Sequence, residues 1–386
     1  MRRFDRSFRL IIAAQILFAL GLGLYYQLIF VYALSLGASR FTIGVLQAVW
    51  LACTAIGFIP GAWAAKRFRL KPVIAGVWWL TVPAATCFAL APSWPWLIPG
   101  FVLSGFYMAN NPAFKSYIYL KSEPARVARN MAYIFGAYPI GLIFAPLLGG
   151  YLADRIGMRW VFAISIVLYA ASSTVITLIE DTPYHTAESR WTLASLYANR
   201  LFRRYVVFFF VGFLAVYLGQ PFLTPFLKQV HGQGYTALGT YAALAALGAA
   251  VMCPLMGQAT DRFGPRLGTG AVLGFLVAGA TLLITGAHPV VWGAAMLCYG
   301  AFDTFRFITN GIIAKSFGDV PLAWGYAIFD SIMGIPSVIG GLLGGFLYRQ
   351  RYQLPFVVVI GLGLALIVMI AATTRRSGRH VAAAPD

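Results

Sequence analysis

Gly257-Gln258-Ala259-Thr260-Asp261-Arg262-Phe263-Gly264-Pro265-Arg266 is a short polar stretch between two long apolar runs, at about residues 236–259 and 267–287. A bilayer core of about 30 Å is crossed by about 20 apolar residues in a helix. Because lipid offers no hydrogen-bond partners to the backbone, such a run must be helical. The stretch therefore predicts a charged turn between two membrane-spanning helices.

The same pattern extends over the whole chain of 386 residues, of which 60% are hydrophobic and only 10% are charged. A soluble domain carries about 25% charged residues. We therefore predict an all-α membrane protein with twelve transmembrane helices. The predicted spans lie at about residues 9–34, 42–65, 72–91, 96–116, 131–153, 160–179, 205–227, 236–259, 267–287, 290–313, 324–348 and 354–373. The first span is too long for a signal peptide, whose apolar region has about 7–15 residues, and is interpreted as a retained helix.

The basic residues predict the orientation of these helices. With the predicted boundaries, 22 of the 29 lysines and arginines lie on the side of the N-terminus, 6 lie on the other side, and Arg306 lies within a helix. Because cytoplasmic loops are rich in Lys and Arg, both termini are predicted to be cytoplasmic, in a bacterial or archaeal cell membrane. The net charge of +18 does not indicate a nucleic-acid partner, because the basic residues form short clusters between apolar runs.

Two halves of the chain resemble each other. A polar linker at 181–204 separates a predicted six-helix bundle at 1–180 from a second at 205–374, and a cytoplasmic tail follows at 375–386. At a shift of 195 residues, Gly44 coincides with Gly239, and Leu147-Leu148-Gly149-Gly150 coincides with Leu342-Leu343-Gly344-Gly345. Duplicated bundles are typical of transporters whose substrate site lies between the halves near the membrane midplane.

With this layout, the sequence resembles the major facilitator superfamily over nearly its whole length, which implies two pseudo-symmetric six-helix bundles. Residues 257–266 are similar to the family's cytoplasmic G-x-x-x-D-R-x-G-x-R signature, which implies a gate latch. A glycine permits a tight turn, and a carboxylate at a helix end can cap amides or pair with arginine. An ordinary charged loop is the alternative. The implied gate residues are Gly257, Asp261, Arg262, Gly264 and Arg266.

The first half departs from these patterns in places. At the matching site, Ala65 replaces the acid and Phe68 replaces the second glycine. Residues 141–150 resemble the G-P-x-x-G-G motif of family exporters, with Ala145 in place of a glycine, and residues 154–160 are also family-like. Phe101 stands where proton-coupled drug antiporters carry an arginine in helix four, which argues against drug–proton antiport.

Charged residues inside predicted helices mark a candidate transport site, because burying a charge in a membrane is costly. Asp303, Arg306 and Asn310 are spaced to share one helix face, and Asp330 lies in the following helix. The Asp303–Arg306 pair is interpreted either as a substrate or proton site or as a self-neutralising structural pair. Asp330 is interpreted either as a proton carrier or as a hydrated helix end.

Polar residues of other helices complete the candidate site. Asn110, Asn111, Gln27 and Gln220 lie in helices one, four and seven, and the family resemblance implies that helices one, four, seven and ten line the cavity. Hydrogen bonding between helices is an equal alternative for the glutamines. Lys115 is expected to snorkel to the inner surface. The many aromatic residues are expected to be core and interface residues, with none assigned to a binding site.

These features predict a secondary active transporter that moves a small solute by alternating access, driven by a proton gradient, with export as a candidate direction. A uniporter or importer of a sugar or other metabolite, a lipid scramblase and a partner-dependent membrane subunit remain alternatives. The sequence has no G-x-x-x-x-G-K-[ST] loop, catalytic set or metal cluster, so neither an enzyme nor a cofactor is expected. The expected partners of a monomeric chain are the bilayer and the solute.

Overall fold

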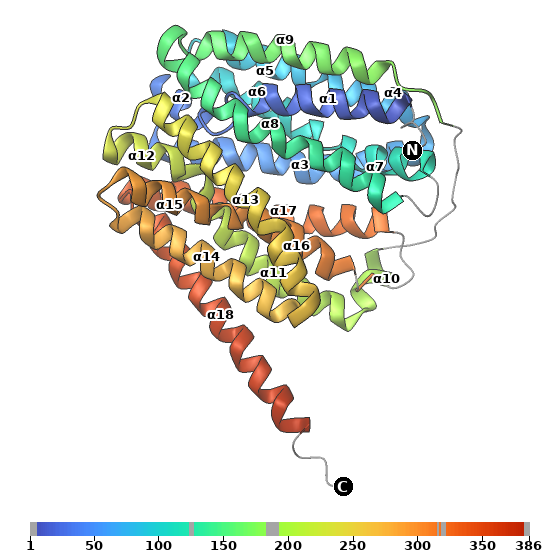
Figure 1. Ribbon diagram of the computed structural model, residues 1–386, viewed down its shortest axis with the longest axis vertical. Helices are drawn as coiled ribbons and strands as arrows, with labels where there is room; N and C mark the ends of the chain where they lie inside the picture. The colour runs from blue at the N-terminus through green and yellow to red at the C-terminus, as the bar shows by residue number, and fades with distance from the viewer. Residues whose placement is uncertain (1–5, 123–126, 183–192, 315, 318–321, 382–386) are drawn as a thin grey trace.

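The computed structural model describes residues 6–122, 127–182, 193–314, 316–317 and 322–381, which form helices joined by short connections (Figure 1). Within these residues there is no strand. The first half contains α1 (Arg6–Gly23), α2 (Ile29–Ser35), α3 (Arg40–Arg67), α4 (Leu70–Trp79), α5 (Thr81–Leu90), α6 (Ile98–Tyr107), α7 (Asn110–Lys121), α8 (Val127–Ile156) and α9 (Met158–Thr177). The second half contains α11 (Arg200–Gly219), α12 (Leu223–His231), α13 (Tyr235–Phe263), α14 (Pro265–Thr285), α15 (Pro289–Tyr299), α16 (Ala301–Ala314), α17 (Leu322–Gln350) and α18 (Leu354–Val381).

The all-helical fold is the one predicted. Among the described residues, nine helices are long and apolar enough to cross a membrane, which supports an integral membrane protein. The predicted spans at about 96–116, 131–153 and 290–313 are not among them. The first and third are each interrupted, as α6–α7 and α15–α16, and the second corresponds to α8. The count of twelve spans therefore stays a prediction.

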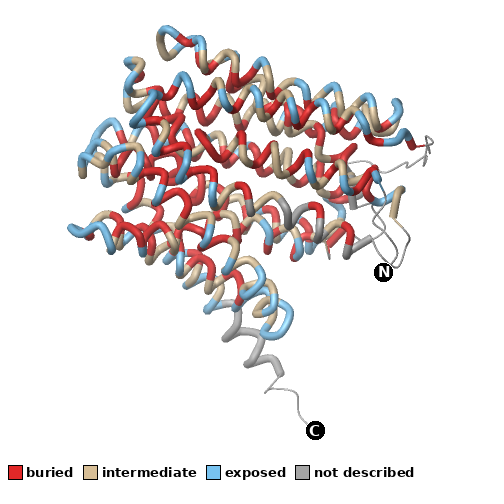
Figure 2. The backbone as a smooth tube through the Cα atoms, turned by 45° about the horizontal axis from the view of Figure 1, so that its top comes forward, coloured by how far each residue is buried: buried red, intermediate tan, exposed pale blue. Residues whose placement is uncertain are grey.

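The two halves lie side by side as bundles, with the N-terminal bundle above the C-terminal one in Figure 1. We call the end where α1 begins the proximal end, and the end where α2 and α12 lie the distal end. Buried residues face the interior of the helix packing, while exposed residues lie on the outer helix faces (Figure 2). Large apolar side chains such as Val167, Val207 and Trp160 are more than half exposed, as expected of a surface that meets lipid.

The halves meet along two helix pairs, α3 with α17 and α8 with α13. A β-carbon on Gly44 would lie 2.3 Å from the carbonyl oxygen of Gly341 and 2.9 Å from the Cα of Gly345. A β-carbon on Gly239 would lie 2.2 Å from the carbonyl oxygen of Pro146 and 3.0 Å from the Cα of Gly150. The predicted shift of 195 residues relates the Gly44–Gly345 contact to the Gly239–Gly150 contact, so the pseudo-symmetry of the halves is confirmed. Glycine is required at these positions because the backbones touch.

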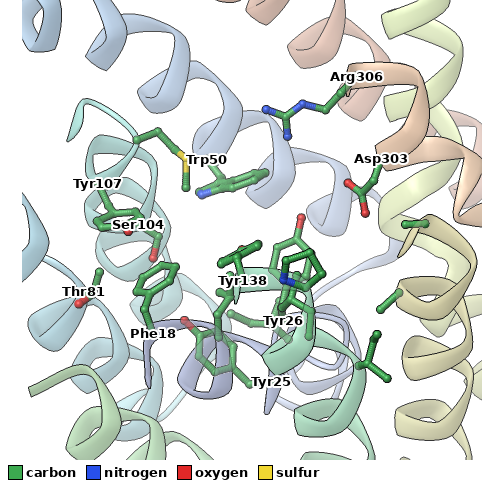
Figure 3. Close-up of a pocket in the computed structure, with 18 of the residues that line it drawn as sticks. Phe18, Tyr25, Tyr26, Trp50, Thr81, Ser104, Tyr107, Tyr138, Asp303 and Arg306 are labelled. Carbon is green, nitrogen blue, oxygen red and sulfur yellow. The ribbon is translucent and has the colours of Figure 1, made fainter. Parts of the chain in front are cut away.

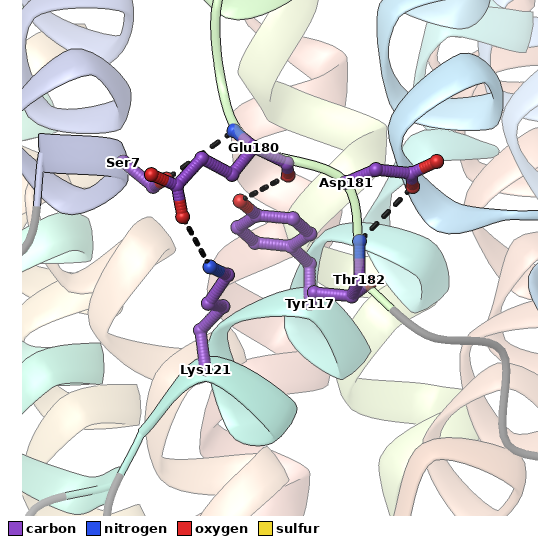
Figure 4. Close-up of polar contacts among 6 residues, drawn as sticks. All are labelled: Ser7, Tyr117, Lys121, Glu180, Asp181 and Thr182. Carbon is purple, nitrogen blue, oxygen red and sulfur yellow. Dashed lines mark hydrogen bonds and ion pairs between the residues drawn. The ribbon is translucent and has the colours of Figure 1, made fainter.

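A polar cluster ties Glu180, the last residue before the predicted linker, to the proximal end of the first half (Figure 4). Lys121 donates to a carboxylate oxygen of Glu180 at 2.6 Å, and the Tyr117 hydroxyl donates to the Glu180 carbonyl oxygen at 2.7 Å. The Glu180 amide donates to the Ser7 hydroxyl at 3.3 Å. The bond and charge of Lys121 hold the pKa of the exposed Glu180 carboxyl below its usual value. α9 is thereby fixed to α1 and α7.

The predicted boundaries of the linker and tail fall partly outside the described residues. Arg69 forms an ion pair with Asp181 at 3.0 Å, so the first linker residue is also held to the first half. Residues 183–192 of the linker and 382–386 of the tail are not described. The described part of the linker includes α10 (Leu193–Ala198), and α18 continues through the described part of the tail to Val381.

Candidate functional site

A cavity of about 670 Å³ lies between the two halves (Figure 3). Its walls come from α1, α2, α3, α5, α6, α8 and α9 of the first half and from α13 and α16 of the second half. Pockets for small organic ligands have volumes of about 300–1,000 Å³. The cavity is therefore large enough for such a molecule, at the interface where a transporter of duplicated bundles binds its substrate.

The first half contributes an aromatic wall to this cavity. Phe18 stacks on Tyr107 with ring centroids 4.7 Å apart, and Tyr25 shares a hydrogen bond of 2.9 Å with the buried Tyr169 hydroxyl. Tyr26 and Trp50 pack edge to face at 6.1 Å. These contacts restrain the rings, so the wall is a pre-formed apolar surface with a few hydroxyl groups. The expectation that no aromatic residue belongs to a binding site is not supported by this arrangement.

The second half contributes charge. The carboxylate of Asp303 and the guanidinium of Arg306 are both directed into the cavity from α16 (Figure 3), and Asn310 lines it farther along the same helix. Although they interact electrostatically, Asp303 and Arg306 form no ion pair with each other or with another described residue. The direct contact that a self-neutralising pair would use is thus absent from this conformation of the described chain.

Asp330 does not line the cavity, but it lies within electrostatic range of two cations. Lys115 on α7 and Arg306 on α16 both interact with the Asp330 carboxylate on α17. The Lys115 ammonium also lies 5.1 Å from the ring centroid of Tyr326, one turn before Asp330. Asp330 therefore has charged neighbours from both halves, which spacing along the chain could not reveal.

The predicted amides occupy different places. Gln220 lies at the break between α11 and α12, and its side-chain oxygen accepts from the Gln47 side chain of the other half at 3.3 Å. Gln27 lies at the break between α1 and α2, and its carbonyl oxygen accepts from Thr224 at 2.6 Å. Both glutamines line a small pocket beside the main cavity. Asn110 and Asn111 do not line either space.

A carboxylate bridge closes the distal end. Asp154, near the end of α8, accepts hydrogen bonds from the backbone amides of Tyr235 at 3.1 Å and Thr236 at 2.7 Å, and from the Thr236 hydroxyl at 2.7 Å. These groups form the first turn of α13, so Asp154 caps a helix of the opposite half. Partial burial opposes ionisation, but the hydrogen bonds outweigh it and hold the pKa of Asp154 below its usual value.

The predicted gate motif is not engaged in this conformation. Asp261 and Arg262 are exposed at the proximal end of α13, and neither makes a hydrogen bond or ion pair with a described residue. A β-carbon on Gly257 would meet no described atom within 4 Å. Gly264 has φ of 89°, the positive value that the turn of the signature needs, and Arg266 is exposed just after it.

The distal bridge uses the same spacing as this gate motif. Gly150, Asp154, Arg155, Gly157 and Arg159 repeat the G-x-x-x-D-R-x-G-x-R pattern, and Gly157 has φ of 85°. No role is assigned to residues 154–160 from the sequence alone. The repeated spacing was the signal that could have found it. α8 and α13 lie together distally and diverge toward the proximal end (Figure 1), so this conformation is closed at the distal end.

Residues 11–318 match a family model described as Major Facilitator Superfamily. The chain belongs to this superfamily. It is 23% identical to the "Uncharacterized MFS-type transporter Rv0849" of Mycobacterium tuberculosis, over 97% of this chain and 94% of that protein. It is 31% identical over 124 residues to the "MFS-type transporter ppzB" of Metarhizium rileyi, a match that spans only 26% of that protein. The crystal structure of a D323A mutant of the nucleoside transporter NupG has the same fold, with a TM-score of 0.77, 16% identity and coverage of 95% of this chain and 99% of that one. Membership of this family supports a role in membrane transport.

Proposed function

We propose that this protein is a secondary active transporter that carries a small organic solute across the membrane through the cavity between its halves. The observation that supports this most directly is the cavity itself, which has an aromatic wall on one half and the Asp303 and Arg306 charges on the other. Because the two walls belong to separate bundles, rocking of the bundles would expose the same site to either side in turn.

The proximal end is proposed to face the cytoplasm, because the basic residues concentrate on that side. The structure then corresponds to a state closed to the outside. Opening outward would separate Asp154 from α13 and Gly44 from Gly345. Closing the cytoplasmic side would bring the exposed Asp261 toward the first half, where a helix end could receive it. We propose proton coupling through Asp330, and export as the direction on the basis of the exporter-like residues 141–150.

Reconstitution of the purified protein in proteoliposomes tests the proposal. A transporter should accelerate counterflow of a solute that stabilises it in a thermal-shift screen, and the rate should saturate with solute concentration. Liposomes without protein are the control. The same vesicles should not move a fluorescent phospholipid between leaflets. Lipid movement without solute counterflow would instead identify a scramblase.

Replacing Asp154 with alanine is expected to favour opening of the distal end. Loss of a helix-capping side chain costs about 1 kcal/mol, or about fivefold in the equilibrium between closed and open states. Spin labels at the exposed Ile156 and Val230 would report the change as a longer interlabel distance. Asp154→Asn retains a capping oxygen and is the matched control, with a smaller shift. Equal distances in Asp154→Ala and the unsubstituted protein would contradict the bridge.

The same contact should depend on pH in a defined direction. Because hydrogen bonding lowers the pKa of Asp154, the bridge stabilises the closed state fully above the ordinary aspartate pKa of about 3.9. It is lost as the pH falls through the lowered value. The interlabel distance should therefore be constant between about pH 5 and 8 and lengthen only in stronger acid.

Asp261→Asn is expected to lower the turnover rate several-fold while leaving solute affinity unchanged. Asp261 lies eight residues along α13 from the cavity-lining Cys253, is exposed, and makes no hydrogen bond or ion pair with a described residue in this state. A latch of the opposite state changes conformational exchange and not the binding site. Counterflow rates and binding titrations on the same preparation check this, with Arg200→Gln, at another exposed proximal position, as the control. An unchanged rate would remove the latch assignment.

A further inference from the structure

A small polar pocket of about 70 Å³ adjoins the main cavity on its distal side. Asp303 and Tyr26 line both spaces, so the Asp303 carboxylate lies where the pocket meets the cavity. One water molecule takes up about 30 Å³ of liquid volume. The pocket therefore has room for a group of a few heavy atoms at most, and not for a ring.

Hydrogen-bond acceptors converge on this pocket. Besides Asp303, its lining includes the amide side chains of Gln27 and Gln220 and the aromatic residue Tyr299. The Tyr299 hydroxyl is buried and has no hydrogen-bond partner among the described residues. Leaving a buried polar group unpaired costs about 1–3 kcal/mol. This hydroxyl is enclosed and lies 3.5 Å from where a β-carbon on Gly219 of α11 would be, so it is not open to a ligand in the pocket. The polar groups that remain for a hydrogen-bond donor are the Asp303 carboxylate, which has no ion pair with a described residue, and the residues Gln27 and Gln220.

The two cavity charges are divided between the two spaces. Arg306 lines only the main cavity, whereas Asp303 lines both. They lie one helical turn apart on α16, and neither is ion-paired. Charges removed from water need counter-charges close by. A ligand that satisfies both residues must therefore carry a cation and an anion a few bonds apart.

We propose that the transported solute is a zwitterion with a primary ammonium group, an adjacent carboxylate and an apolar body that contains a ring. The ammonium occupies the small pocket, where its N–H donors reach Asp303 and the side-chain oxygens of Gln27 and Gln220. The carboxylate binds Arg306, whose planar guanidinium suits bidentate pairing. The body packs on the aromatic wall of Phe18, Tyr25 and Trp50. This inference rests on the proposed function, since it names the solute of that same site.

Other charge patterns leave one side of the site unpaired. A simple carboxylate would bind Arg306 but leave the Asp303 carboxylate without a donor, next to a like charge. A simple amine would leave Arg306 with only the electrostatic attraction of Asp303 and Asp330, neither of which forms an ion pair with it. A trimethylammonium group has the right charge, but it has no N–H donor and carries three methyl groups into a space of about 70 Å³. The small pocket therefore selects a primary ammonium group over a trimethylammonium group.

Binding to the purified full-length protein tests the inference, with isothermal titration calorimetry and thermal shift as readouts. The probes are L-tryptophan and O-benzyl-L-tyrosine as zwitterions, their N-acetyl derivatives as anions, their ethyl esters as cations, and N,N,N-trimethyl-L-tryptophan. We expect at least one free amino acid to bind at least about tenfold tighter than its acetylated, esterified and trimethylated forms. Equal or tighter binding of an anion, ester or trimethylated form would overturn the inference. So would the absence of binding by every probe up to about 10 mM.

Variants separate the roles of the side chains. Asp303→Asn should lower the affinity for the zwitterion about tenfold or more. It should also reduce the difference in affinity between the zwitterion and the N-acetylated anion. Arg306→Gln should reduce the difference in affinity between the zwitterion and its ethyl ester. If Asp303→Asn leaves the affinity for the zwitterion unchanged, the ammonium does not occupy this pocket.

Different results would contradict the zwitterion site and the proposed transport function. Binding in detergent does not require movement of the halves, so a zwitterion that binds without counterflow would contradict the proposed function and not the site. The thermal-shift screen could instead yield an uncharged or singly charged solute that shows counterflow. That result would support the transporter and overturn the zwitterion.

Discussion

Gly44→Val should abolish transport, with a counterflow rate at least about 100-fold below that of the unsubstituted protein. The β-carbon alone would lie 2.3 Å from the Gly341 carbonyl oxygen and 2.9 Å from the Gly345 Cα, both across the interface of the halves. Such distances are far inside van der Waals contact, and the obstacle is backbone, which cannot rotate away. The distal end could then not close, and the protein would remain in the opposite state.

The internal repeat supplies a second test of this prediction. Gly239→Val blocks the equivalent contact with Pro146 and Gly150, and it should give the same phenotype. Gly361→Val on α18 is the control, because a β-carbon there meets no described atom within 4 Å, while the helix-propensity change is the same. Size-exclusion profiles and melting temperatures establish that the variants fold. The distance between labels at Ile156 and Val230 should lengthen in Gly44→Val and Gly239→Val and stay unchanged in Gly361→Val. Wild-type counterflow by folded Gly44→Val would show that distal closure does not need this contact.

These glycines illustrate how much of the fold could be predicted from the sequence. The register of 195 residues, found from matching glycines and the repeated Leu-Leu-Gly-Gly, relates two backbone contacts in the structure. The pattern is readable because close backbone approach admits only one residue type. The breaks between α1 and α2 and between α15 and α16 were not predicted, because the apolar runs continue through them and apolarity does not distinguish a continuous helix from an interrupted one.

The candidate site was predicted only in part. Asp303, Arg306 and Asn310 do line the cavity, because helical spacing along one chain segment is visible in sequence. The aromatic wall was missed, since rings of the same type also occur in the core and at the lipid surface. The role of Asp154 was missed for a different reason. Its partners, Tyr235 and Thr236, lie 81 and 82 residues away, and the contact depends on which end of the protein is closed.

Asp330 shows the same limit, because its charged neighbours come from distant parts of the chain. Asp330→Asn should lose solute accumulation driven by a pH gradient, with the accumulation ratio falling to about one, while counterflow continues. The physical reason lies in its neighbours, Lys115 from the first half and Arg306 from the second. A nearby cation favours an ionised carboxylate, and desolvation favours the neutral one. Because Lys115 and Asp330 belong to different halves, rocking of the bundles would change their separation, and under the proposed function this links protonation to conformation.

The measurement uses proteoliposomes with and without an imposed pH gradient, and the same solute in both assays. Counterflow requires exchange of solute but no net proton movement, so it reports that the variant still binds and changes conformation. Asp330→Glu keeps a titratable carboxyl and should retain part of the gradient-driven accumulation, which makes it the matched control. Accumulation by Asp330→Asn in response to the gradient would assign proton coupling elsewhere. If the unsubstituted protein itself ignores the gradient, the protein is a uniporter or uses another ion. Asp330 would then be a structural partner of Lys115 and Arg306.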